Sequence, residues 1–101
     1  MKKIEVIFPP SRISDMREAL AEHRIFEFIV SDVTDIAPKN ARGFDDRDIQ
    51  RNMGEKAAYK LELVTSDTRA SDITETLSIV LIGYGADSKI LVTNVREVVT
   101  H

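Results

Sequence analysis

The stretch that decides the fold is Lys2-Lys3-Ile4-Glu5-Val6-Ile7-Phe8, in which apolar and polar residues alternate. Successive side chains of a β-strand point to opposite faces of the sheet. One face of this stretch is therefore apolar and carries Ile4, Val6 and Phe8. The opposite face is mixed and carries Lys3, Glu5 and Ile7. The stretch predicts a strand that is covered on one face only.

The spacing of apolar residues alternates along the chain between a period of two and a helical period. The period of two predicts three more strands, at residues 26–33, 59–64 and 89–92, with a short edge segment at 95–99. The helical period predicts two helices, at residues 13–20 and 70–81. Pro38 is expected to end strand pairing after the second strand, because proline has no N–H to donate. The order predicts an α+β, ferredoxin-like βαββαβ sandwich in a single domain, residues 1–101, with both helices on one face of an antiparallel sheet.

The face of the sheet away from the helices has no cover within one chain. It is expected to mix apolar side chains with charges, and the apolar members are Ile7, Ile29, Val33, Val64 and Leu91. The charged members are Lys3, Glu5, Lys60 and Glu62. Packing this face against other copies would bury the apolar residues and pair the charges, which predicts a symmetric oligomer. The alternative is a monomer, because scattered apolar residues are normal on protein surfaces.

Composition limits the classes of function. The chain has 101 residues and a formal net charge of -3, which argues against general affinity for nucleic acids or anionic lipids. It has no cysteine and no long apolar run near its start, so we expect a cytoplasmic protein. The sequence has no Gly-x-Ser-x-Gly or His-Glu-x-x-His motif, and His23 and His101 have no other histidine and no cysteine nearby in the sequence. These features predict a protein that is not an enzyme.

Residues 36–56 form the longest stretch without sustained periodicity. A segment of this length in a small domain is usually functional or disordered. We expect it to contact a partner protein through apolar anchors and basic side chains, which are Phe44, Arg47, Ile49, Arg51 and Met53. The segment also contains an acidic cluster, Asp45, Asp46 and Asp48. These carboxylates could bind a divalent cation, but we prefer the interpretation that they are solvated charges.

Several blocks of the sequence resemble, in order, those of the PII signal-transduction proteins of nitrogen regulation. The blocks are Met1-Lys2-Lys3-Ile4-Glu5, Met16-Arg17-Glu18-Ala19-Leu20, Ile29-Val30-Ser31-Asp32-Val33, Lys60-Leu61-Glu62-Leu63-Val64 and Asp87-Ser88-Lys89-Ile90-Leu91-Val92. The resemblance implies a homotrimer with adenine nucleotide in the clefts between subunits. It also implies that residues 36–56 act as the T-loop that regulates a partner transporter or enzyme.

The resemblance also implies which residues surround the small-molecule effector: Lys39, Glu62, Gly83, Asp87 and Lys89. This chain departs from the family at five places, two of which are Ala37-Pro38-Lys39 at the base of the T-loop and one residue missing between Gly83 and Lys89. Arg51 stands where the family has the tyrosine that is uridylylated, and Ala58 replaces a lysine. The pair of phosphate-binding arginines near the family's C-terminus has no counterpart before His101. Because a triphosphate needs several cations at once, we do not expect the ATP and 2-oxoglutarate site of the family, and the effector stays open, with ADP or AMP among the candidates.

Two alternatives to this function remain open at the level of sequence. One is a metal-responsive trimer similar to CutA proteins, and the other is a PII-like sensor of a non-nucleotide anion such as bicarbonate. Gly83 and Gly85 likewise have two interpretations, a helix end followed by a turn or an anion-binding nest.

Overall fold

Strand β1 (Lys2–Phe8) forms where the alternation predicts it, and it is one of the two inner strands of the sheet. The computed structural model describes residues 1–38, 53–82 and 88–100. A 3-10 turn η1 (Pro10–Arg12) leads from β1 into helix α1 (Ile13–Glu22). The remaining elements are β2 (Ile29–Pro38), β3 (Met53–Thr65), α3 (Asp67–Val80) and β4 (Lys89–Asn94). This order confirms the predicted ferredoxin-like arrangement.

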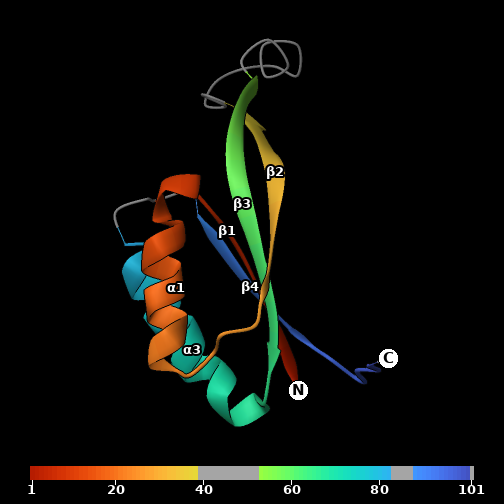
Figure 1. Ribbon diagram of the computed structural model, residues 1–101. Helices are drawn as coiled ribbons and strands as arrows, with labels where there is room; N and C mark the ends of the chain where they lie inside the picture. The colour runs from red at the N-terminus through yellow and green to blue at the C-terminus, as the bar shows by residue number, and fades with distance from the viewer. Residues whose placement is uncertain (39–52, 83–87, 101) are drawn as a thin grey trace.

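The four strands form one antiparallel sheet in the order β2-β3-β1-β4. Both helices lie on the same face of this sheet, and the other face is open (Figure 1). None of the helices in the described ranges is long and apolar enough to cross a lipid bilayer.

The core lies between the helices and the apolar face of the sheet. Its largest side chains have no exposed surface, and they are Ile4, Val6, Phe8, Met16, Leu20, Leu61, Ile73 and Leu77. The ring of Tyr59 closes one end of this core by an edge-on contact with Phe8, with ring centroids 6.0 Å apart. Most residues that the alternation and the helical spacing place on one face are therefore buried, whereas Ile13 and Val80 are only partly buried.

Helix α1 ends in a tight backbone turn that decides where β2 begins. Arg24 adopts a left-handed conformation with φ 59°, and its N–H donates to the carbonyl of Ala21 at 2.9 Å. The N–H of Ile25 donates to the carbonyl of Leu20 at 2.9 Å, which completes a Schellman motif. The chain then runs without strand pairing to Ile29, so the expected start of the strand at residue 26 is wrong by three residues.

Strands β2 and β3 are longer than predicted and pair along a ten-residue ladder from Ile29 opposite Glu62 to Pro38 opposite Met53. Pairing therefore enters both ends of the segment that was expected to be a loop. Pro38 is tolerated because it is the last residue of a strand at the edge of the sheet. The ladder passes beyond Tyr59, which faces the last residue of β1, and this outer part is here called the hairpin arm: residues 33–38 and 53–58.

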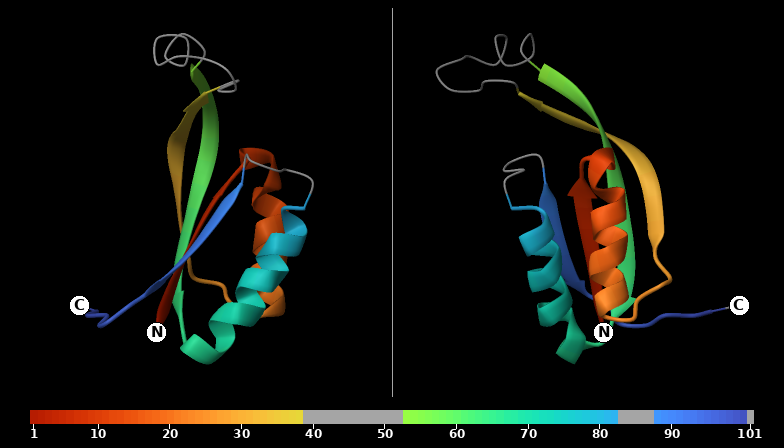
Figure 2. Two further views of the ribbon diagram at one scale, coloured as in Figure 1. Left: turned by 180° about the vertical axis from the view of Figure 1, so that it is seen from behind. Right: turned by 60° about the vertical axis from the view of Figure 1, so that its left-hand side comes forward.

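The C-terminal residues depart from the expected edge strand. Strand β4 continues to Asn94, opposite Lys2, and residues 95–99 then leave the sheet (Figure 2). The N–H of Val95 donates to the carbonyl of Met1 at 2.9 Å. The pairing of β4 with β1 thus ends at Lys2, the first residue of β1.

Candidate functional site

The centre of the open sheet face carries four charged residues at neighbouring positions on β1 and β3. Glu5 and Glu62 face each other directly across the two strands, which by itself is unfavourable. Lys3 lies 2.9 Å from Glu5 and 3.5 Å from Glu62, and Lys60 lies 3.0 Å from Glu62 and 3.7 Å from Glu5. Each ammonium thus bridges both carboxylates, and the group, here called the charge cluster, is neutral as a whole.

The electrostatics of the charge cluster follow from these contacts. The hydrogen bond to Glu5 raises the pKa of Lys3, and the hydrogen bond to Glu62 raises the pKa of Lys60. The hydrogen bond from Lys60 lowers the pKa of Glu62. All four side chains are 22 to 34% exposed, so they are partly withdrawn from water although this face has no cover within the chain.

Apolar side chains surround the charge cluster on the open face. The most exposed of them are Ile29 at 64%, Leu91 at 54% and Val64 at 44%. Val64 pairs with Lys3 and Leu91 pairs with Glu5 across neighbouring strands, so both lie beside the charges. The structure therefore places the predicted residues together on one face, with the charges at the centre.

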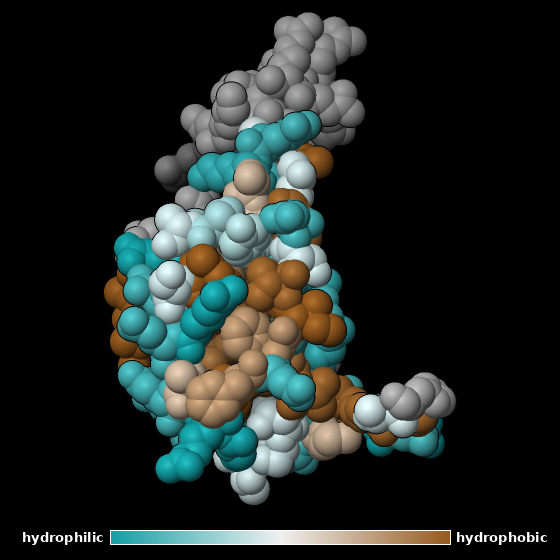
Figure 3. Space-filling model, viewed as in Figure 1, coloured by the Kyte–Doolittle hydropathy of each residue, from teal (hydrophilic) through white to brown (hydrophobic). Residues whose placement is uncertain are grey.

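Two shallow grooves adjoin β2. One is lined by Lys3, Glu62, Ile29, Val64 and Val98 together with residues that precede β2. The other lies between α1 and β2, where Figure 3 shows apolar side chains gathered. Phe26 borders both grooves and is 75% exposed. Phe26 was expected to lie within a strand, so these grooves were not predicted from the sequence.

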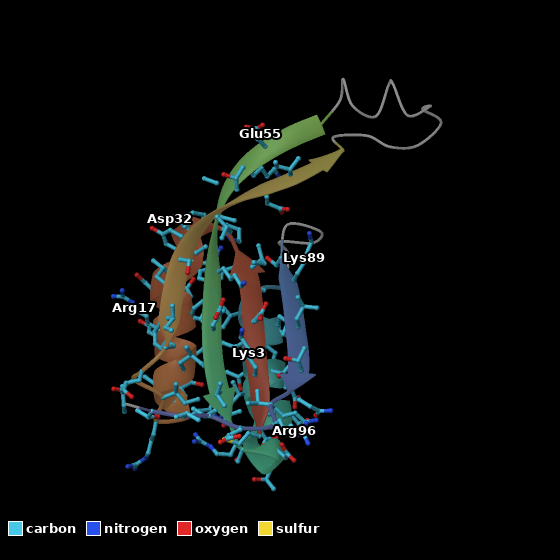
Figure 4. All side chains as sticks on the ribbon, turned by 90° about the vertical axis from the view of Figure 1, so that its right-hand side faces the viewer. Lys3, Arg17, Asp32, Glu55, Lys89 and Arg96 are labelled. Carbon is cyan, nitrogen blue, oxygen red and sulfur yellow. The ribbon has the colours of Figure 1, made fainter. Side chains whose placement is uncertain are left out.

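At the other end of the sheet, Lys89 begins β4 beside the hairpin arm (Figure 4). Its ammonium lies 3.6 Å from the carboxylate of Asp35 on β2, and the two side chains are 57% and 17% exposed. Asp35 and Lys56 also border a small pocket with Pro9 and Ala58. The cation expected to meet an anionic effector therefore already has an anionic partner within the chain.

The predicted site residues fall into two groups. Glu62 and Lys89 are described, and both lie on the open face, Glu62 in the charge cluster and Lys89 beside Asp35. The other effector and partner residues lie outside the described part of the chain, and they are Lys39, Phe44, Arg47, Ile49, Arg51, Gly83 and Asp87. Met53 is the first residue of β3, and its side chain also lies outside the described part.

Asp35 is a site residue that the sequence reasoning did not single out. A signal was present, because Ile29, Val33 and Asp35 stand at alternating positions and so share one face of an extended strand. The second strand was expected to end at residue 33, which left Asp35 outside the sheet.

Comparisons with known proteins bear on the fold. No protein-family model matches the sequence, and no curated protein matches it. Among solved structures, the chain is similar to GlnK of B. subtilis, a PII protein, in a complex with ATP, with a TM-score of 0.73 and 21% sequence identity. The match covers 94% of this chain and 82% of that chain. The resemblance to PII proteins that the sequence blocks indicate is thereby confirmed for the fold.

Proposed function

We propose that this chain is a PII-like regulatory protein that binds a small anionic effector and regulates a partner transporter or enzyme through residues 36–56. The observation that carries the proposal is the similarity in fold to GlnK over 94% of the chain. The hairpin arm projects beyond the end of β1 (Figure 1), which is the geometry of a domain that presents a segment to a partner.

The open face supports assembly into a homotrimer. Ile29, Val64 and Leu91 expose much of their surface in the single chain, and covering such a surface with other copies removes it from water. The charge cluster is neutralised within the chain, so its burial does not leave an unpaired ion at the interface. We therefore place effector binding in clefts between subunits of such a trimer.

Lys89 and Glu62 are the described residues that we assign to the effector. Lys89 is 57% exposed and supplies a cation, whereas Glu62 borders the groove beside Val64. Ala58 is 6% exposed and provides no charge where the resemblance implies a lysine. A site with few cations favours a mono- or diphosphate over a triphosphate, so we propose ADP or AMP as the effector class.

The described part of the chain gives no support to the metal-responsive alternative, since no group of three histidine, aspartate or glutamate side chains gathers there. The acidic residues Asp45, Asp46 and Asp48 lie outside the described ranges.

Light scattering and calorimetry test the proposal. Scattering at micromolar concentration is expected to give about three times the chain mass of 11.4 kDa. Calorimetry is expected to show ADP or AMP binding more tightly than ATP, and Lys89→Met should abolish it, whereas the control Lys2→Met on the same sheet should not. A clean monomer, or submicromolar binding of ATP, would overturn the proposal, and binding of bicarbonate alone would favour the non-nucleotide alternative.

A further inference from the structure

The contact between Asp35 and Lys89 joins the two outer strands of the sheet. In the order β2-β3-β1-β4, these strands are separated by β3 and β1. The register places Ser31 opposite Lys60, Lys60 opposite Ile7, and Ile7 opposite Lys89, so Ser31 and Lys89 lie on one line across the sheet.

In a flat sheet the two groups could not meet. Three strand spacings of about 4.8 Å and four residues of about 3.3 Å each would separate the Cα atoms of Asp35 and Lys89 by roughly 20 Å, which is more than the two side chains together can span. The charged atoms are in fact 3.6 Å apart. The contact exists because the hairpin arm bends over the end of β1 towards β4, as Figure 4 shows.

The chemistry of the contact is that of an anion bound by a cation. The Asp35 carboxylate is mostly shielded from water at 17% exposure, while Lys89 remains 57% exposed and open to ligands. An anion that binds at the position of this carboxylate has to displace it from the Lys89 ammonium. If it displaces the carboxylate, the arm loses an attachment to β4 that the structure shows.

We infer that Asp35 is an internal competitor for Lys89, so that an anionic effector has to displace the hairpin arm in order to bind. This inference rests on the proposed role of Lys89 in effector binding. It adds that Asp35 lowers the affinity of the site for phosphate-type anions and couples occupancy of the site to the position of the arm.

The binding test uses inorganic pyrophosphate as the probe and calorimetry at low salt. Asp35→Asn keeps the shape of the side chain and removes its charge, and it should tighten pyrophosphate binding about threefold to fivefold, as expected for a partly exposed ion pair. The control is Asp32→Asn, three residues earlier on the other face of β2, which has no ion pair with a described residue and should leave binding unchanged.

A second measurement needs no ligand. Asp35→Asn and Lys89→Met should each accelerate amide hydrogen exchange at residues 33–36 and 55–58 severalfold, and the double variant should add little to either. Raised salt should likewise accelerate exchange at these residues in the unmodified chain, because salt screens the ion pair. Pyrophosphate should accelerate exchange at the same residues.

The outcomes separate this inference from the proposed function. If the unmodified chain and Asp35→Asn bind pyrophosphate equally, or if neither binds it, the competition is overturned. Unchanged exchange in Asp35→Asn overturns the coupling to the arm. If Lys89→Met binds ADP or AMP as tightly as the unmodified chain, the assigned effector site itself is wrong, whatever Asp35 does.

Discussion

On strand β1, Ile4, Val6 and Phe8 have no exposed surface, whereas the alternating residues Lys3 and Glu5 remain 34% and 22% exposed. The same strand thus contributes side chains to one face of the sheet that is covered within the chain and to another face that is not. On the covered face, the helices and the apolar side chains of the neighbouring strand β3 complete the packing within the chain. On the open face, charges neutralise one another, and the apolar side chains around them stay exposed in the single chain. The comparison teaches that the covered face and the open face, which we propose as the assembly surface, are encoded by alternate residues of the same segments.

The largest effect is expected from a charge introduced on the open face, where it should disrupt the proposed assembly. Val64→Lys places a cation beside Lys3, its partner across the strands, at a surface that we propose is buried on assembly. An unpaired charge buried at an interface costs several kcal/mol, so the trimer should dissociate and light scattering should report the mass of one chain. Ile79→Lys, at a helical position that is 62% exposed, is the control and should stay trimeric. A trimeric Val64→Lys would show that the open face is not the interface.

The next prediction compares the loss of stability when a leucine is shortened on each of the two faces of the sheet. Leu61→Ala removes a side chain with no exposed surface, and it should lower the free energy of unfolding by about 3 kcal/mol. Leu91→Ala removes one that is 54% exposed, and it should cost less than about 1 kcal/mol in a chain kept monomeric by Val64→Lys. Urea denaturation measures both. Equal losses in the monomeric background would contradict the assignment of the two faces.

A smaller effect concerns the end of the helix that covers the sheet. Arg24 has a positive φ of 59°, which costs a residue with a side chain about 1 kcal/mol more than glycine. Arg24→Gly should therefore raise the free energy of unfolding by about that amount, as measured by urea denaturation. Arg24→Ala keeps the Cβ atom and should give no such gain. A gain in both variants would mean that the arginine side chain, and not the backbone, is unfavourable.

The smallest expected effect concerns how the charge cluster makes the free energy of unfolding depend on pH. The pKa of Glu62 is lowered in the folded chain, so its contribution to stability is present above its ordinary value of 4.5 and is lost as the pH falls through the folded value. The pKa values of Lys3 and Lys60 are raised, so their contribution is present below 10.5 and lost at higher pH. Glu62→Gln should flatten the fall in unfolding free energy between about pH 5 and pH 3. Glu75→Gln, on α3 and without an ion pair to any described residue, should leave that slope unchanged.

The fold could be predicted because local patterns agree with the global arrangement. The alternation of β1 marks both faces of the sheet, and the helical spacing of Ala70, Ile73 and Leu77 marks the side of α3 that packs on it. The bounds of β2 were harder to predict. Thr34 and Asp35 interrupt the apolar alternation, and backbone pairing with β3 extends the strand beyond the residues that the core requires.

The candidate site could be predicted only in part. The sequence places Glu62 and Lys89 on the open face by alternation alone. It cannot place Asp35 against Lys89, because that contact depends on how far the hairpin arm bends over the end of β1. Phe26 is a comparable case, since the turn at Arg24 removes it from the strand that its neighbours predict.

The hairpin arm also has a consequence for the solubility of the protein. Beyond Tyr59, strand β3 no longer pairs with β1, so the arm is a two-stranded ribbon with an open edge on each side. Open edges are templates on which other chains can add strands and start aggregation, and charged side chains are a common protection against this. Glu55 and Lys56 are both exposed on this stretch of β3. They are positioned to act as gatekeepers that keep neighbouring molecules from pairing edge to edge.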